Sequence, residues 1–378
     1  MSAKLLKSMQ SAMQLVKGGQ VQEATHLIQQ SLSGALPTTV GHSATNDSVV
    51  SIDPTSALNA GASVTRKTAP QSQPYTQPNR PTHMNSKPQS GQFISKQYRS
   101  SHGARRYKLY IPAQYQPEQA LPLVVMLHGC TQSADDFARG TNMNALADEM
   151  GCVIAYPSQT KANNPNKCWN WFNLQDQQRD QGEPAIIAGI TRIIVDDYAI
   201  DPKRVYIAGL SAGGAMATIM GATYPDIYAG IGVHSGLARG SASDMMSALT
   251  AMRAGKSANS VQTLTQSRFV PTIVFHGDQD AVVATINGDQ VLAEAQAALA
   301  NDDPDYYATT EQQQAVGKRS SKRTLLYAAN GDIQVEHWLI NGAGHAWSGG
   351  NQAGTYADPT GPDASREMLR FFLTHSQG

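Results

Sequence analysis

From about residue 96 onward, continuous apolar runs alternate with segments of helical periodicity. The apolar runs cover residues 121–129, 152–157, 204–209, 230–236, 271–277 and 335–342. Runs of this kind are typical of strands buried on both faces of a parallel sheet. The segments between them include "NALADEMG", "EPAIIAGITRIIVDDYA" and "GAMATIMGATYP", whose apolar spacing favours helices. This alternation predicts an α/β domain over 96–378, with a mostly parallel open sheet and helices on both faces.

Two hairpins complete the predicted domain. "FISKQYRS" and "RRYKLYIP" indicate an opening hairpin, and "NGD" at 330–332 indicates a tight turn between two late strands.

The pattern changes completely before residue 96. Over 1–33, apolar residues recur at helical spacing on both sides of Gly18 and Gly19, which predicts a helical hairpin. We interpret this hairpin first as an amphipathic packing element, and second as a contact for a polymer surface or a partner. Residues 34–95 are rich in Ser, Thr, Pro, Gln and Asn, so they bury too little apolar surface to fold and are predicted to be a disordered linker.

Net charge, apolar runs and cysteine count argue against several classes of protein. The 378 residues carry a formal net charge of zero, which argues against an electrostatic nucleic-acid binder. No apolar run approaches the roughly 20 residues of a membrane-spanning helix. Polar residues interrupt the N-terminal apolar stretch, so it is a poor secretory signal. Three cysteines are too few for a disulfide scaffold, and their spacing does not fit a zinc site.

One serine lies in an unusual setting. Ser211 in "AGLSAGG" (208–214) follows the apolar run "RVYIA" and precedes a predicted helix. The pattern G-x-S-x-G between a strand and a helix indicates a sharp turn that presents a nucleophilic hydroxyl above the sheet. The alternative is a glycine-rich turn with an incidental serine.

Such a serine needs a base and an acid, which follow it along the chain in α/β-type hydrolases. Asp280 in "HGDQDAVV" is the preferred acid, with Asp278 as the alternative. His345 in "NGAGHAWSGG" is the preferred base, and His234 and His276 are its rivals.

Acyl transfer also needs donors for the oxyanion. One predicted donor is the backbone amide of Ala212, which follows the serine. The second is the amide of Cys130, which follows the strand end "LHG".

Taken together, these residues resemble the polyhydroxybutyrate (PHB) depolymerase type of esterase, an α/β-hydrolase group that also includes feruloyl and acetylxylan esterases. The matching stretches are "LHGCTQSADDFARGTNMNALADE", "YPSQ", "CWNWFN", "YIAGLSAGGAMA", "GVHSGL", "FHGDQDAVV" and "NGAGHAWSGG", spread over about residues 105–372. The resemblance implies an α/β-hydrolase fold, hydrolysis of short-chain polyester or related ester bonds, and no cofactor or metal. It supports Ser211 as nucleophile, Asp280 as acid, His345 as base and Cys130 as oxyanion residue.

Two departures from secreted depolymerases bear on the substrate. The chain shows no clear signal peptide, and it ends in "DASREMLRFFLTHSQG" without a polymer-binding module. Both argue against extracellular attack on crystalline polymer. Soluble oligomers, amorphous polymer or another ester stay open as substrates. The missing signal favours the cytoplasm, whereas the family resemblance favours export.

Aromatic residues and cysteines near these motifs give further candidates. Trp347, two residues beyond His345, is a predicted wall of the acyl pocket. Trp169 in "KCWNWFN" is either a second wall or a hydrophobic plug under a long loop. Cys168 is a candidate disulfide partner for Cys130, which requires an oxidising compartment. Cys152 begins an apolar strand and is predicted to lie in the core.

The sequence therefore predicts a serine esterase acting on short-chain polyhydroxyalkanoate. A feruloyl or acetylxylan type of carbohydrate esterase is the alternative enzyme. An inactive hydrolase domain that binds granules or a partner is the alternative of another class. The predicted partner is a polyester or a small ester, with neither nucleic acid nor a transmembrane segment.

Overall fold

The computed structural model describes residues 91–256, 268–314 and 316–378, and these form one large sheet covered by helices. The sheet contains β1 (Gln92–Ser100), β2 (Gly103–Ile111), β3 (Leu121–Leu127), β4 (Val153–Pro157), β5 (Ile200–Leu210), β6 (Gly230–His234), β7 (Thr272–Gly277), β8 (Tyr307–Gln313), β9 (Ser321–Tyr327) and β10 (Ile333–Ile340). The helices are α3 (Ala134–Thr141), α4 (Met143–Met150), α5 (Gly182–Asp197), α6 (Ala212–Thr223), α7 (Met245–Ala254), α8 (Ile286–Asp302) and α9 (Ala364–Phe372), with a short 3-10 helix η1 (Leu174–Gln177). A separate pair joins β11 (Trp347–Ser348) to β12 (Ala357–Asp358).

The centre of the sheet is parallel and its edges are antiparallel. The strand order is β1-β2-β4-β3-β5-β6-β7-β10-β9-β8. All pairs from β4 to β10 in this order are parallel, whereas β1-β2, β2-β4, β10-β9 and β9-β8 are antiparallel. This arrangement confirms the predicted α/β class with a mostly parallel sheet. Because the parallel strands are continuous apolar runs, helices must cover both faces of the sheet.

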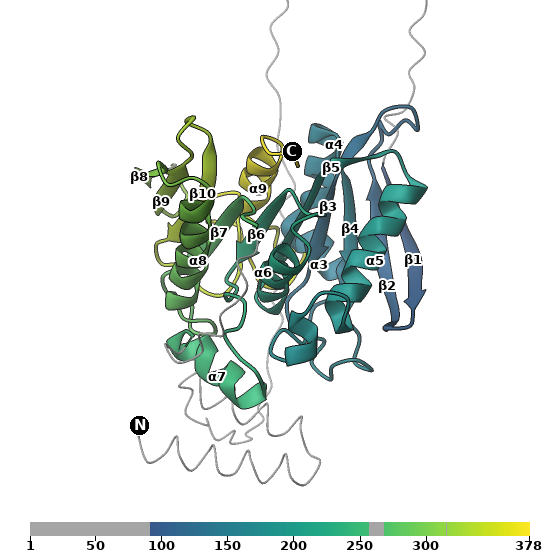
Figure 1. The fold of residues 1–378 in the computed structure, drawn as a ribbon, viewed down its shortest axis with the longest axis horizontal. Helices are drawn as coiled ribbons and strands as arrows, with labels where there is room; N and C mark the ends of the chain where they lie inside the picture. Colours follow the sequence, from purple (N-terminus) through teal and green to yellow (C-terminus); the bar gives the residue numbers. More distant parts are fainter. Residues whose placement is uncertain (1–90, 257–267, 315) are drawn as a thin grey trace, which may run out of the picture. The chain divides into compact units, whose positions relative to one another are not determined.

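Two hydrophobic layers hold the helices to the sheet (Figure 1). On one face, buried residues of α5, α6, α7 and α8 pack against alternate residues of the strands. On the other face, α3, α4 and α9 pack against the intervening residues. Side chains alternate between faces along a strand, so neighbours such as Val124 and Val125 on β3 contribute to different layers.

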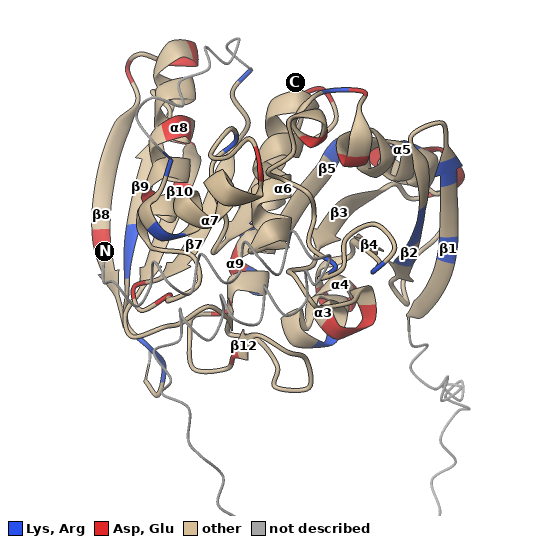
Figure 2. Ribbon diagram, turned by 90° about the horizontal axis from the view of Figure 1, so that it is seen from below, with Lys and Arg blue, Asp and Glu red and all other residues tan. Residues whose placement is uncertain are grey.

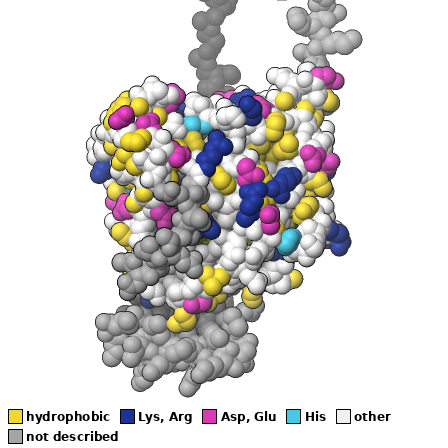
Figure 3. Space-filling view, in the orientation of Figure 1, with side chains coloured by type: hydrophobic (Ala, Val, Ile, Leu, Met, Phe, Trp, Pro, Cys, Tyr) yellow, Lys and Arg dark blue, Asp and Glu magenta, His cyan; other side chains and the backbone are white. Residues whose placement is uncertain are grey.

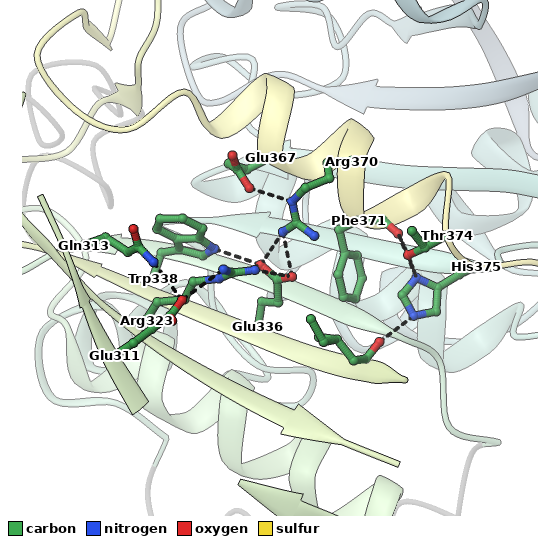
Figure 4. Close-up of polar contacts among 11 residues, drawn as sticks. Glu311, Gln313, Arg323, Glu336, Trp338, Glu367, Arg370, Phe371, Thr374 and His375 are labelled. Carbon is green, nitrogen blue, oxygen red and sulfur yellow. Dashed lines mark hydrogen bonds and ion pairs between the residues drawn. The ribbon is translucent and has the colours of Figure 1, made fainter. Parts of the chain in front are cut away.

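A buried ion-pair cluster fixes α9 against β9 and β10 (Figure 4). The side chain of Glu336 on β10 is fully buried and accepts hydrogen bonds from Arg323, Arg370 and the indole of Trp338. A buried carboxylate is tolerated only when such donors compensate for its lost hydration. The cluster therefore fixes one position of the C-terminal helix.

The structure corrects several sequence boundaries. β1 begins at Gln92 and pairs with β2, so the folded domain starts before the predicted residue 96. β8 was missed, because its residues "YATTEQQ" are largely exposed and polar. The predicted 330–332 turn is confirmed, since β9 and β10 are antiparallel and Gly331 has a φ of 91°. The predicted N-terminal hairpin (1–33) and almost all of the predicted linker (34–95) lie outside the described residues. Among the described helices, none has the length and apolar character to cross a bilayer.

Candidate active site

Ser211 occupies the sharp turn between β5 and α6. Its φ of 57° and ψ of −120° are rare for a residue with a side chain, and strained geometry of this kind concentrates at functional sites. A Cβ on Gly209 would collide with the backbone of Gly213, and one on Gly213 would collide with the carbonyl of Leu127 on β3. Glycine at both positions therefore allows the start of α6 to lie directly against the ends of β5 and β3.

His234, one of the predicted rivals for the base, braces this turn instead. Its carbonyl accepts a hydrogen bond from the amide of Ser211 at 2.9 Å, and its ring Nε2 accepts one from the amide of Ser348 at 2.9 Å. Complete burial lowers the pKa of His234 to about 3, so the ring is neutral near pH 7. His234 thus connects the serine turn to the segment that follows His345.

Asp280 and His345, the predicted acid and base, lie in direct contact. His345 Nδ1 lies 2.7 Å from Asp280 Oδ2. The other oxygen, Oδ1, accepts hydrogen bonds from the amides of Val282 and Val283. Burial acts to raise the pKa of Asp280, but the hydrogen bond and charge of His345, the amide of Val283 and the nearby His276 together hold that pKa below its usual value. The contact with the ionised carboxylate orients the ring of His345 and leaves Nε2 outside it, which is the arrangement that general-base chemistry requires.

The other predicted acid and base do not share this geometry. Asp278 Oδ1 accepts from the amide of Gly342 at 2.7 Å and so shapes the loop before His345. His276 Nε2 lies 2.8 Å from the carbonyl of Val283 and 3.6 Å from Asp280 Oδ2. Burial lowers the pKa of His276, so it supports the Asp280 loop as a neutral ring.

Ser211, Asp280 and His345 follow β5, β7 and β10, whose carboxyl ends share one edge of the sheet. In the part of the chain that the structure describes, no hydrogen bond joins Ser211 Oγ to His345. Catalytic hydrogen bonds of this type often tighten only when substrate is bound.

The two predicted oxyanion donors lie where β3 meets the serine turn. A Cβ on Gly129 would come within 3.6 Å of Ser211 Cβ, so the loop after β3 runs directly beside the serine. Gly129 N donates to Gln132 Oε1 at 2.9 Å, which fixes the loop before Cys130. Among residues 91–256, 268–314 and 316–378, the amides of Cys130 and Ala212 have no acceptor. Both can therefore serve an incoming oxygen.

A disulfide joins Cys130 to Cys168, the pairing that the sequence left open. It connects the loop after β3 to the segment 159–173. The third cysteine, Cys152, is buried and unpaired, as predicted, and burial raises the pKa of its thiol to about 12.

Trp169 is fully buried beneath the disulfide loop. Its indole donates to the carbonyl of His128 at 3.1 Å, which corresponds to the predicted plug. Glu183, a buried residue that the sequence analysis missed, accepts from the amide of Asn170 and pairs with Arg105. Burial raises the pKa of Glu183 to about 7. These contacts hold the segment 159–173 against the domain.

Trp347 does not form the predicted pocket wall. Only 1% of it is exposed, its indole donates to Ser365 Oγ at 2.9 Å, and it packs on Phe137 and His234. A large aromatic residue near a catalytic histidine looks like a substrate contact in sequence. Here Trp347 is the first residue of β11, and its side chain lies in the core, where it supports the His345 loop.

A hollow of about 580 Å³ lies beside the pair, and the sequence analysis did not find it. It is lined by Thr131, Gln132, Ser133, Asp136, Lys167, Thr355 and Tyr356. The ring of Tyr356 lies 6.4 Å from that of His345. Figure 2 shows α3 and β12 on the same side of the sheet, the side that also carries α9. Among the described residues, no group of three His, Cys, Asp or Glu side chains could hold a metal ion.

Comparison with known proteins relates the chain to ester hydrolases. The family model described as "Esterase PHB depolymerase" matches residues 105–302, more than half of the chain. The chain is 36% identical over 248 residues to poly(3-hydroxyalkanoate) depolymerase C of Paucimonas lemoignei, covering 62% of this chain and 58% of that protein. It is 30% identical over 257 residues to poly(3-hydroxybutyrate) depolymerase of Ralstonia pickettii, covering 65% and 51%.

The chain therefore spans only about half to three fifths of the length of these curated relatives. Among solved structures, the acetyl xylan esterase from Aspergillus awamori superposes with a TM-score of 0.57 at 17% identity, covering 74% of this chain and 99% of that one. This likeness supports the α/β-hydrolase fold. The chain belongs to the esterase PHB depolymerase family, because the family model matches residues 105–302 and the fold and the serine turn agree with that match.

Proposed function

We propose that this protein is a serine esterase that hydrolyses the ester bonds of short-chain polyhydroxyalkanoates such as poly-3-hydroxybutyrate. The observation that carries the proposal is the 2.7 Å contact between Asp280 and His345, at the same sheet edge as the strained Ser211. A carboxylate, an imidazole and a serine in this chain order are the parts of a serine hydrolase.

The reaction proceeds in two halves. Ser211 Oγ attacks the ester carbonyl while His345 accepts its proton, and the amides of Cys130 and Ala212 bind the developing oxyanion. The bond to the alcohol oxygen then breaks, and His345 gives the proton to that departing oxygen. Water next attacks the acyl-enzyme with His345 again as base, which releases the acid and restores Ser211. No cofactor enters this scheme.

The surface near the site favours an apolar polymer. Met245 and Met246 on α7 are about half exposed, and so are Val282 and Ile286, which follow Asp280. The amide of Ala284 donates to Met252 on α7 at 2.7 Å, so the two segments adjoin. Figure 3 shows hydrophobic atoms at the lower edge of the molecule, where Figure 1 places α7. Exposed apolar side chains grouped in this way suit contact with a polyester surface.

A carbohydrate esterase of the feruloyl or acetylxylan type is the second candidate. The polar lining of the hollow beside His345 is the observation that favours it, because hydroxyl, amide and carboxylate groups also suit a sugar. A binding protein without activity is less favoured, because it would not need the Asp280–His345 contact.

The test is turnover of amorphous poly-3-hydroxybutyrate, methyl ferulate and p-nitrophenyl butyrate by the full chain and by Ser211→Ala. We expect polymer and p-nitrophenyl ester hydrolysis by the wild type, and loss of both in the variant. Cleavage of ferulate without polymer would transfer the assignment to the carbohydrate esterases. Equal activity of the variant and the wild type would remove Ser211 from the mechanism.

A further inference from the structure

The hollow beside His345 is lined by two loops that the disulfide joins and by the segment before β12. Thr131 follows Cys130 with a φ of 67°, and Lys167 precedes Cys168 with a φ of 53°. Both are left-handed conformations that cost energy for residues with a Cβ. The amide of Thr131 donates to the carbonyl of Asn166 at 2.6 Å, so the loops also pair directly. The fold thus maintains two strained residues that line one hollow.

The acceptor groups of this hollow are already occupied. Asp136 accepts from the amide and hydroxyl of Thr355 and from Gln132 Nε2, and Arg139 lies 3.9 Å from its carboxylate. Gln132 Oε1 accepts from the amide of Gly129. These contacts join α3 to the loop before β12 and leave little acceptor capacity for a ligand.

Hydrogen-bond donors of the hollow still have protons without an acceptor among the residues that the structure describes. Lys167 Nζ donates to the carbonyl of Gln132 at 3.0 Å, and an ammonium group has three protons to donate. Within the described residues, no carboxylate lies within 4 Å of Lys167 Nζ. The hydroxyl of Tyr356 lies 3.5 Å from that of Thr131. Thr131 Oγ1 itself donates to the carbonyl of Cys130 at 2.6 Å. The hollow therefore offers the half-buried ammonium of Lys167 and the hydroxyl of Tyr356 to an anionic ligand.

The position of the hollow identifies which part of a substrate would enter it. It extends from Thr131, next to the oxyanion residue Cys130, to Tyr356, next to His345. His345 protonates the departing alcohol, so the leaving group must lie on its side of the scissile bond. When the terminal unit of a polyhydroxyalkanoate leaves, it is a hydroxyacid whose other end is a free carboxylate.

We propose that this hollow is the subsite for the leaving hydroxyacid and that Lys167 binds its free carboxylate. The enzyme would then prefer chain ends and short oligomers of a 3-hydroxyalkanoate over the interior of a chain. The inference rests on the proposed function, because it needs an ester whose alcohol part carries a carboxylate. Lys167 would then determine the preference for substrates whose leaving group carries a carboxylate.

The first test compares kcat/KM for the linear 3-hydroxybutyrate trimer as free acid and as methyl ester. We expect the wild type to favour the acid about tenfold, in line with one charge-assisted hydrogen bond. Lys167→Met should bring the ratio close to one, and Lys167→Arg should retain most of it. Lys161→Met removes an exposed lysine from the same segment and should keep the wild-type ratio. An equal rate on both trimers in the wild type, or an unchanged ratio in Lys167→Met, would overturn the assignment.

The second test does not need polyester hydrolysis. 3-Hydroxybutyrate and its methyl ester are compared as competitive inhibitors of p-nitrophenyl butyrate hydrolysis. The acid should inhibit the wild type more strongly, and Lys167→Met should weaken that inhibition about tenfold. If the enzyme cleaves p-nitrophenyl butyrate but not oligomers, the proposed function fails while this inhibition still decides the role of Lys167. Equal inhibition by acid and methyl ester would reject the subsite even in an active polyesterase.

Discussion

Both carboxylate oxygens of Asp280 have hydrogen-bond partners. One oxygen contacts the ring of His345, and the other accepts two backbone amides of the following turn. Its neighbour Asp278 accepts a backbone amide from Gly342 instead. Two carboxylates two positions apart in sequence thus have different tasks, because only one points toward the histidine.

This difference gives a matched pair of variants. Asp280→Asn keeps the size of the side chain but removes the charge that stabilises the imidazolium, so kcat on p-nitrophenyl butyrate should fall by about 10³- to 10⁴-fold. Asp278→Asn should keep kcat within a few-fold, since an amide oxygen can still accept from Gly342. Similar losses in both variants would show that the two carboxylates are not distinguished as the geometry indicates.

At the residue scale, the sequence indicated candidate residues but not the direction in which their side chains point. The order of Ser211, Asp280 and His345 along the chain marked them as candidates, because strand ends converge on one edge of the sheet. The side-chain directions of Trp347 and Trp169 depend on packing from distant helices and loops, so no local pattern could show that both are core residues. Glu183 was missed because an acidic residue at the start of a helix is common, and its burial depends on contacts with distant segments.

Among the elements, the loop after β3 depends most on a covalent link. The Cys130–Cys168 disulfide closes a loop with a sequence separation of 38 residues and connects two segments that hold strained residues. Polar contacts also hold the second segment, including the hydrogen bond from Gln159 Nε2 to the carbonyl of Cys168 at 3.0 Å.

We therefore expect Cys168→Ser to lower the free energy of unfolding by up to about 4 kcal/mol, the chain-entropy value for a loop of this length. kcat should fall as well, because the amide of Cys130 loses its fixed position. The checks are urea unfolding and p-nitrophenyl butyrate turnover, with Cys152→Ser as the control for removing a thiol that forms no disulfide. Unchanged turnover in Cys168→Ser would show that the oxyanion loop is held without the disulfide.

The strands were predictable where apolar runs were continuous, and less so at the edges. β3, β4, β6 and β7 are buried along their whole length, and β5 is buried from Val205 to Leu210, so their apolar runs are visible in the sequence. β8 lies at the sheet edge with exposed polar residues, so neither alternation nor an apolar run marks it. Its place is fixed by pairing with β9, a long-range contact that a local pattern does not contain.

Across the whole molecule, buried neutral histidines make stability depend on pH. Burial lowers the pKa of His128 and His337 to about 4 and that of His234 to about 3. In the unfolded chain each titrates near 6.5. Their contribution to stability is therefore present above pH 6.5 and is lost as the pH falls toward 4. Glu183 and Glu294, whose pKa values are raised by burial, act in the opposite direction.

The contribution of a single histidine to this pH dependence can be measured at His337, which lies on β10. Its Nε2 is buried without a partner among the described residues, so its substitution breaks no hydrogen bond of that atom. His337→Gln should reduce the slope of the unfolding free energy against pH by about 1.2 kcal/mol per pH unit between pH 5 and 6. Urea unfolding of both proteins at several pH values measures it. Parallel pH profiles would mean that His337 is protonated in the folded protein.

The role of Ser211 as nucleophile is tested by covalent labelling of the full chain with diethyl p-nitrophenyl phosphate, followed by peptide mass mapping. We expect a single diethylphosphoryl group on Ser211, with loss of ester hydrolysis in proportion to the labelled fraction. Labelling at another residue, or ester hydrolysis that continues at full rate after Ser211 is labelled, would contradict that role.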